Sequence, residues 1–205
     1  MVSYFAKIRE RFTPDFYSKV RQYGSSDERP LIILGLSCAG KSTLERMLST
    51  CPGIAMGGET QAYKRAVDLL PKISPQFPVA KAVDAVPSEA FKQAAQSYTD
   101  YLNNIDSQAL RVSDSNPSNF YNIGLLPLLF PQARVIFCRR SRQDLAMATY
   151  FKNYHMMGPR YAASLENIMH YINLYEDLCD FIKEILPLKI MEIDYESVLQ
   201  TPEES

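Results

Sequence analysis

The stretch LIILGLSCAGKSTLERML, residues 31–48, decides the fold of this chain. Its four leading apolar residues, 31–34, predict a buried parallel strand, and a helix is expected from Lys41 to about Thr50. The loop between them, residues 35–42, matches the pattern GxxxxGK[ST] at every fixed position. A glycine-rich turn between a strand and a helix presents backbone N–H groups and the positive helix end to a phosphate. This segment therefore predicts a site for a phosphate-bearing ligand.

The side chains of the loop have separate expected roles. Lys41 can reach a terminal anionic group of the ligand, and the hydroxyl of Ser42 can contact an oxygen or a metal ion. The ligand-binding residues predicted in this segment are Gly35, Ser37, Cys38, Ala39, Gly40, Lys41, Ser42 and Thr43.

Strands alternate with helices along the rest of the chain. Strands are expected at residues 109–114, 133–138 and 188–195, and helices at 88–105, from 117 towards 129, after Ser141, and at 164–186. The helix at 88–105 carries Phe91, Tyr98 and Leu102 on one face. This alternation predicts an α/β fold, a three-layer sandwich of the P-loop NTPase type, in which helices flank a central parallel sheet. Ligands of such sheets bind at the carboxyl ends of the strands.

Two segments of unequal size are expected along the chain. Residues 1–29 predict a helix and a linker. Phe5, Ile8 and Phe12 recur at helical spacing that favours docking on the main domain over lying on a membrane surface. The main domain is expected at residues 30–205.

Composition limits the function classes. The net charge of −1 gives no basic surface for nucleic acid. No apolar run approaches a membrane span and no secretory signal is evident, so a cytoplasmic protein is expected. The cysteines have no metal-like spacing, which favours free thiols and no metal site. They are Cys38, Cys51, Cys138 and Cys179.

A second anion site is predicted where the strand at 133–138 ends. Arg139, Arg140 and Arg142 gather there, at the start of the next helix. A helix N-terminus already carries about half a positive charge, so concentrated arginines are unfavourable there without an anion. The alternative is that two of the three point into water. Two positive sites at one sheet edge suit a nucleotide with phosphates at both ends.

Several segments resemble the sulfotransferases that use 3′-phosphoadenosine 5′-phosphosulfate (PAPS). They include FPQARVIFCRR (130–140), IDYESVL (193–199) and GLSCAGKSTLERMLSTCPGIAMGGET (35–60), in which Pro52 and Glu59 keep the family spacing. The likeness is to the tyrosylprotein-sulfotransferase and bacterial branch, over roughly residues 30–202. Family members usually continue through further helices, so the domain is expected to be short at its C-terminus.

The resemblance implies roles for the matched positions. Gly40, Lys41 and Ser42 would contact the 5′-phosphosulfate, and Arg140 would hold the 3′-phosphate. Glu59 would be the general base that takes the proton from a hydroxyl acceptor, which is a sugar, a tyrosyl peptide or a small metabolite. The product would be 3′,5′-ADP.

Some positions depart from the family pattern. Lys41 replaces a threonine and can restore positive charge that the loop has lost. The other departures are Cys38 for arginine, Ala39 for serine, Ser115 for lysine, and Ala148 for a serine in the nucleotide site.

Two other functions fit the same loop. A small-molecule kinase with Mg-ATP or GTP would need a carboxylate for the metal ion at the end of a neighbouring strand, and Asp114 is the candidate. A non-catalytic nucleotide-binding module is the second alternative.

The segment that follows the arginine-bearing helix is rich in large apolar residues. Core packing is expected for them, and contact with the acceptor is the alternative; they are Tyr150, Phe151, Tyr154, Met156 and Met157. Surface or packing roles are expected for His155 and His170, since neither has a metal-ligand partner at helical spacing.

Overall fold

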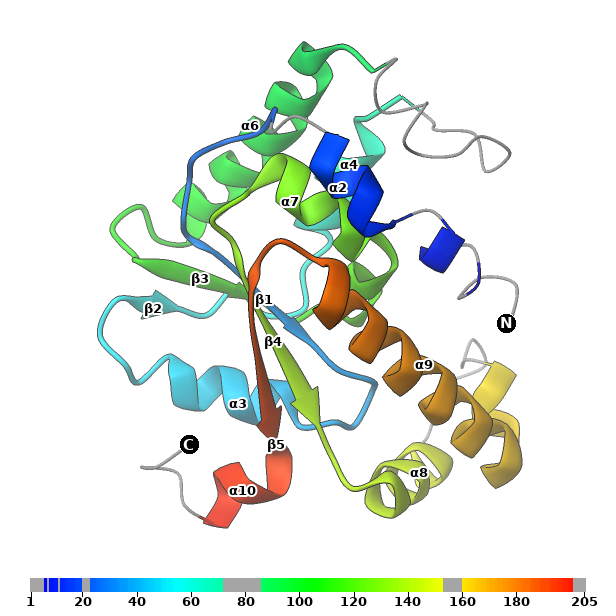
Figure 1. The fold of residues 1–205 in the computed structure, drawn as a ribbon. Coiled ribbons are helices and arrows are strands. Elements are labelled where there is room, and N and C mark those ends of the chain that lie inside the picture. Colours follow the sequence, from blue (N-terminus) through cyan, green and yellow to red (C-terminus); the bar gives the residue numbers. More distant parts are fainter. Residues whose placement is uncertain are drawn as a thin grey trace.

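The computed structural model describes residues 6, 8–10, 12–19, 23–71, 86–152 and 160–200. Within them, five parallel strands form one sheet in the order β2-β3-β1-β4-β5 (Figure 1). The strands are β1 (Pro30–Leu34), β2 (Ile54–Ala55), β3 (Arg111–Asp114), β4 (Arg134–Arg139) and β5 (Lys189–Asp194). β1 is central and has β3 on one side and β4 on the other. The carboxyl ends of these parallel strands meet at one edge, where ligands bind in α/β sheets.

Helices cover the sheet and its edges. They are α2 (Pro14–Lys19), α3 (Lys41–Leu48), α4 (Ala62–Asp68), α6 (Ser88–Ile105), α7 (Leu126–Leu129), α8 (Arg142–Phe151), α9 (Leu165–Ile185) and α10 (Tyr195–Gln200), with 3₁₀ helices η1 (Pro117–Leu125) and η2 (Arg160–Ala163). In Figure 1, β4 and β5 point towards the bottom of the view, where α8 and α10 follow them. No helix in the described part of the chain has the length and apolar character needed to cross a membrane.

The central strand is buried on both faces. Leu31 and Ile33 of β1 pack with Leu44 of α3, whereas Ile32 and Leu34 belong to a larger cluster on the opposite face. That larger cluster includes residues of α6, α7 and α9. The three-layer α/β architecture expected from the sequence is therefore confirmed. Helices on both faces of the sheet bury β1, which explains why this strand is apolar at every position.

The long helices follow the predicted pattern closely. α6 spans residues 88–105 as expected, and Phe91, Tyr98 and Leu102 are fully buried on its inner face. α9 starts at an N-cap serine, Ser164, whose hydroxyl accepts a hydrogen bond from the backbone N–H of Asn167 at 3.2 Å. His170, on α9, is exposed.

Other elements differ from the sequence prediction. The segment after Asn116 begins as the 3₁₀ helix η1 and becomes α-helical only at α7. The side chain of Asn116 caps its start by accepting a hydrogen bond from the backbone N–H of Ser118 at 2.8 Å. Strand β2 and helix α4 were not predicted. The last strand ends at Asp194, and the residues after it form α10 rather than extending the strand.

The expectation that Tyr150 and Phe151 pack in the core is wrong. Their exposed fractions are 46% and 72%, because both lie in the last turn of α8, beyond the buried residues Leu145 and Ala146. Tyr154, His155, Met156 and Met157 lie outside the described residues.

The N-terminal segment packs onto the same core as the sheet. Phe12 and Phe16 are buried in the large cluster, and the hydroxyl of Tyr17 donates to the backbone oxygen of Gly124 at 2.8 Å. Gly124 is required there, since a Cβ at that position would lie 2.5 Å from the Phe12 ring. The predicted docking of Ile8 and Phe12 is confirmed, with exposed fractions of 5% and 3%, and Phe5 lies outside the described residues.

Candidate functional site

The loop between β1 and α3 is held in shape by residues that are distant in sequence. Gly40 has φ of 95°, and a Cβ there would lie 2.1 Å from the ring of Tyr195. A glycine is therefore needed at position 40 for two separate reasons, backbone conformation and contact with an aromatic ring. Cys38 also has a positive φ, 71°, which is uncommon for a residue with a Cβ. Because the loop ends at the start of α3, the backbone N–H groups of Lys41 and Ser42 have no acceptor within the helix, whereas the N–H of Thr43 donates to the backbone oxygen of Gly40 at 3.0 Å.

Lys41 is buried at the N-terminus of α3. Its side chain is 4% exposed, and its ammonium group lies 3.3 Å from the backbone oxygen of Leu36 and 3.8 Å from a carboxylate oxygen of Glu59. Burial lowers the pKa of Lys41, and the Glu59 carboxylate partly offsets this effect. The loop of residues 35–42 is called the phosphate-type loop below. A desolvated cation at its end binds an anion more strongly than an exposed lysine does.

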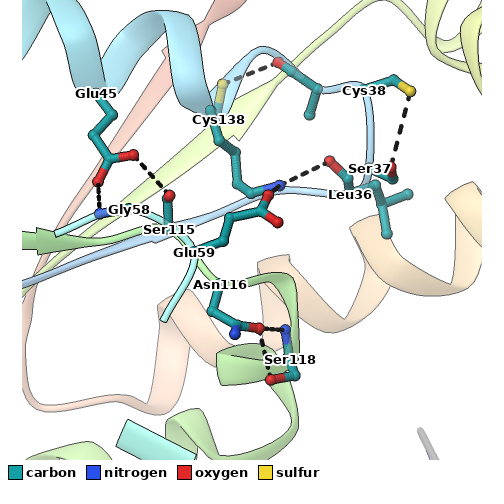
Figure 2. Close-up of polar contacts among 12 residues, drawn as sticks. Leu36, Ser37, Cys38, Glu45, Gly58, Glu59, Ser115, Asn116, Ser118 and Cys138 are labelled. Atoms are coloured by element: carbon teal, nitrogen blue, oxygen red, sulfur yellow. Dashed lines mark hydrogen bonds and ion pairs between the residues drawn. The ribbon is translucent and has the colours of Figure 1, made fainter. Parts of the chain in front are cut away.

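A buried cysteine on β4 holds the backbone of the loop through a hydrogen bond. The thiol of Cys138, on β4, donates to the backbone oxygen of Ala39 at 3.1 Å (Figure 2). Burial raises the pKa of Cys138 to about 11, so the group stays a thiol and keeps its proton for this contact. The hydrogen bond from this thiol and the burial of the Ala39 side chain both stabilise the conformation of the loop.

The three arginines after β4 have different environments. Arg139 forms ion pairs with Asp180 and Glu192, and Arg142 forms one with Glu176. Arg140 has no carboxylate partner among the described residues. Its guanidinium instead donates to the backbone oxygen of Cys38 at 2.7 Å and lies 5.1 Å from the ring centre of Tyr195. The buried Nε of Arg140 has no acceptor in the described part of the chain.

These contacts distinguish the three arginines of the predicted second anion site. Arg139 and Arg142 need no external anion, because acidic residues of α9 and β5 pair with them, although 58% of the Arg142 side chain is exposed to water. Arg140 is the one of the three that lies against the phosphate-type loop with donor capacity unused.

Glu59 lies on a loop whose backbone is tightly constrained. A Cβ at Gly57 would lie 2.2 Å from the backbone oxygen of Ser113, and Gly58 has φ of 73°. The loop therefore needs glycine at Gly57 for close approach and favours it at Gly58 for its conformation. Glu59 follows them and extends over Lys41 with 54% of its side chain exposed.

A residue that the sequence did not single out completes the site. The ammonium group of Lys152, at the end of α8, donates to the hydroxyl of Ser37 at 2.8 Å. The sequence offered one signal for Lys152, namely that it directly follows the helix that begins beside Arg140. Lys152, Lys41 and Glu59 line a cavity of about 280 Å³ together with the loop. The other lining residues are Ser37, Cys38, Gly40, Ser42 and Thr43.

Not every predicted ligand-binding residue lines this cavity. Gly35 and Ala39 are buried within the loop and do not line the cavity, and Arg140 is not among its lining residues either. Ala148 contributes its backbone oxygen, which accepts a weak hydrogen bond from the Cys38 thiol at 3.7 Å.

Asp114, the candidate metal carboxylate of a kinase, is sealed inside the protein. It is fully buried and accepts hydrogen bonds from the Tyr98 hydroxyl, the Asn116 backbone N–H and the Asn119 amide. Burial raises its pKa to about 7. A carboxylate enclosed in this way organises the segment after β3 and would have to lose these contacts before it could bind a metal ion at the loop.

Comparison with known proteins identifies the family. Residues 30–205 match the family model described as the sulfotransferase family. The chain belongs to the sulfotransferase family. A protein of Aquifex aeolicus (strain VF5), described as an uncharacterized protein, is 30% identical to this sulfotransferase-family chain over 206 residues. The alignment covers 95% of this chain and 26% of that protein, so the chain spans about a quarter of the length of this relative.

Solved structures show the same fold. The sulfotransferase domain from the Synechococcus PCC 7002 olefin synthase has a TM-score of 0.53 and 17% identity, covering 90% of this chain and 74% of that domain. Sulfotransferase STF9 from Mycobacterium avium has a TM-score of 0.50 and 16% identity, covering 92% of this chain and 63% of that protein. At these identities the likeness establishes the fold alone.

Proposed function

We propose that this sulfotransferase-family chain transfers a sulfuryl group from PAPS to a hydroxyl acceptor. The observation that carries the proposal is the position of Arg140. It is a cation without a carboxylate partner in the described part of the chain, at the same sheet edge as the phosphate-type loop, with a buried N–H that has no acceptor. A ligand with phosphate at two ends, which distinguishes PAPS from ATP, suits two separate cationic sites.

The residues present fit the donor. Backbone N–H groups at the start of α3, with Lys41 and Lys152, would hold the 5′-phosphosulfate. Arg140 would hold the 3′-phosphate, and Tyr195 supports its guanidinium from beneath. PAPS, when bound, would supply the sulfuryl group. Lys41 and the loop amides would stabilise the negative charge that the departing phosphate acquires.

Glu59 is proposed as the general base. Its carboxylate is exposed towards the cavity and lies 3.8 Å from Lys41, so an acceptor hydroxyl can reach it beside the donor. In the proposed step, the acceptor oxygen bonds to sulfur as the bond from sulfur to the phosphate oxygen breaks. The hydroxyl proton passes to the Glu59 carboxylate.

Nucleotide binding tests the donor assignment. At about 100 times its Kd, 3′,5′-ADP should stabilise the chain by about 2.7 kcal/mol, and EDTA should not reduce the effect. Arg140→Ala should weaken 3′,5′-ADP binding by about 10- to 100-fold because a charged hydrogen bond is lost. Binding of 5′-AMP, which lacks the 3′-phosphate, should weaken much less, by no more than the loss of the Arg140 contact with the loop causes. Arg142→Ala is the matched control, since Arg142 is ion-paired with Glu176.

Two results would contradict the proposal. One is a preference for Mg-ATP or GTP over 3′,5′-ADP. The other is an equal effect of Arg140→Ala on 3′,5′-ADP and 5′-AMP. Sulfuryl transfer is then measured with labelled PAPS and a panel of sugars, tyrosyl peptides and small metabolites, where Glu59→Gln should lower the rate by about 10²- to 10⁴-fold.

A further inference from the structure

Glu45 is a buried carboxylate that the proposed chemistry does not use. It lies on α3, one helical turn after Lys41, and only 3% of the residue is exposed. One carboxylate oxygen accepts hydrogen bonds from the backbone N–H of Gly58 at 2.8 Å and the hydroxyl of Ser113 at 2.5 Å. The other accepts from the hydroxyl of Ser115 at 2.8 Å. Figure 2 shows the Glu45 side chain extending from the helix to Gly58 and Ser115.

This carboxylate has no cationic partner among the described residues. A buried carboxylate is costly even when it is hydrogen-bonded, and an apolar side chain in the same place would often be neutral or stabilising. The contacts of Glu45 therefore point to a role in fixing the position of what it binds.

What Glu45 binds is the backbone that carries Glu59. Gly58 donates to it directly, and Glu59 is the next residue. Ser113 holds the same loop a second time, because its hydroxyl lies 3.3 Å from the backbone N–H of Gly57. Helix α3 thus touches the loop at two points one turn apart, through Glu45 at Gly58 and through Lys41 at Glu59.

We infer that Glu45 is a positioning residue that sets the Glu59 carboxylate relative to the donor site. The inference rests on the proposed function, in which Glu59 is the base. The start of α3 holds the donor phosphate and Glu45 ties the loop of the base to the same helix, so the two reacting sides share one rigid element. Ser115, which stands where the family pattern has a lysine, supplies a hydrogen bond to this contact.

Replacement of Glu45 separates positioning from simple support of the fold. Glu45→Ala frees Gly58 and should lower kcat for sulfuryl transfer by about 100-fold, the cost of a misplacement of about 1 Å. Its Kd for 3′,5′-ADP should stay within about twofold of wild type, because Glu45 is not among the residues that line the donor cavity. Glu45→Gln should recover most of the rate, since its amide oxygen can accept from Gly58 and its NH₂ can donate to Ser115. Arg46→Ala, at the exposed neighbouring position, is the matched control.

A double-mutant cycle gives the deciding measurement. If Glu45 acts only through Glu59, adding Glu45→Ala to Glu59→Gln should cost no further rate. A further loss of about 100-fold in that background, or a parallel loss of 3′,5′-ADP affinity, would overturn the positioning role and leave Glu59 as the base.

Other outcomes are equally decisive. If Glu45→Ala does not fold, Ser115→Ala makes the same comparison with one hydrogen bond removed, and its rate loss must vanish in the Glu59→Gln background. A loss that persists there, or no loss at all, contradicts the inference. If Glu59→Gln retains the full rate, the base assignment itself fails and the role of Glu45 falls with it.

Discussion

At the scale of single residues, the site requires a position without a Cβ atom as well as particular side chains. Gly40 leaves room for the Tyr195 ring, which in turn lies beneath the guanidinium of Arg140. The phosphate-type loop and the proposed 3′-phosphate site are therefore linked through one aromatic side chain. The segment IDYESVL thereby acquires a physical role, because its tyrosine supports both anion sites.

Gly40→Ala should be strongly destabilising. A left-handed backbone costs an alanine about 1–2 kcal/mol, and the clash with Tyr195 adds to this, so a total loss of more than about 2 kcal/mol is expected in urea unfolding. Gly58→Ala is the matched control. It also has positive φ, but a Cβ there meets nothing within 4 Å, so only the backbone cost should appear. Equal losses in the two variants would contradict the proposed role of Tyr195.

Asp114 should make stability depend on pH. Burial raises its pKa from 3.8 to about 7, so in this window the folded chain holds a proton that the unfolded chain has released. The stabilisation is fully present below pH 3.8 and is lost as pH rises through 7, a difference of about 4 kcal/mol. Asp114→Asn keeps the shape and cannot titrate. The unfolding free energy of wild type minus that of Asp114→Asn should therefore fall between pH 4 and 7, and a difference that is flat with pH would refute this account.

At the scale of elements, two helices bring their opposite ends to the site. Helix α3 begins at Lys41, whereas α8 ends just before Lys152. Helix α8 packs through Leu145 and Ala146 against Ala39 of the loop and residues of α9, and this packing carries Lys152 to Ser37. Position along a helix axis, rather than a local motif, therefore decides which lysine joins the site.

Lys152→Gln should weaken nucleotide binding. Removing one of the cations around the donor cavity should raise the Kd for 3′,5′-ADP by about 10-fold and reduce its dependence on salt. Titration calorimetry at two salt concentrations measures both effects. Lys92→Gln, on the exposed side of α6, should leave the Kd unchanged, and equal effects of the two changes would show that only net charge matters.

At the scale of the whole molecule, the N-terminal segment belongs to the same apolar core as the sheet. Phe12 and Phe16 join the cluster that contains residues of β1, α6 and α9. A cation–π contact adds to this packing, since the guanidinium of Arg9 lies 5.4 Å from the ring centre of Phe181 on α9.

Phe12→Ala should therefore destabilise the entire chain. Loss of a buried phenylalanine ring costs about 3–5 kcal/mol, and unfolding followed by circular dichroism and tyrosine fluorescence should remain a single transition at lower denaturant. Phe151→Ala removes the same ring from a site that is 72% exposed and should change stability by less than about 0.5 kcal/mol. A Phe12→Ala chain with wild-type stability would mean that the segment is an independent appendage.

The sequence by itself determined the parallel α/β architecture, the phosphate-type loop and the boundaries of the long helices. These features depend on local signals, namely a continuous apolar strand, apolar residues at helical spacing, and capping residues such as Asn116 and Ser141. Short elements such as β2 and α4 escaped prediction because two to seven residues carry too little periodicity.

Only the tertiary structure decided which charged residues meet. Charge and spacing alone do not distinguish Arg139, Arg140 and Arg142, although the family resemblance favours Arg140. The positions of Asp180, Glu192 and Glu176 on other elements leave Arg140 for the loop. The same holds for Lys152 at Ser37 and Glu45 at Gly58. Side-chain charge acts over a few ångströms in space, whereas the partners here are separated by 13 to more than 100 residues along the chain, so no local pattern can record them.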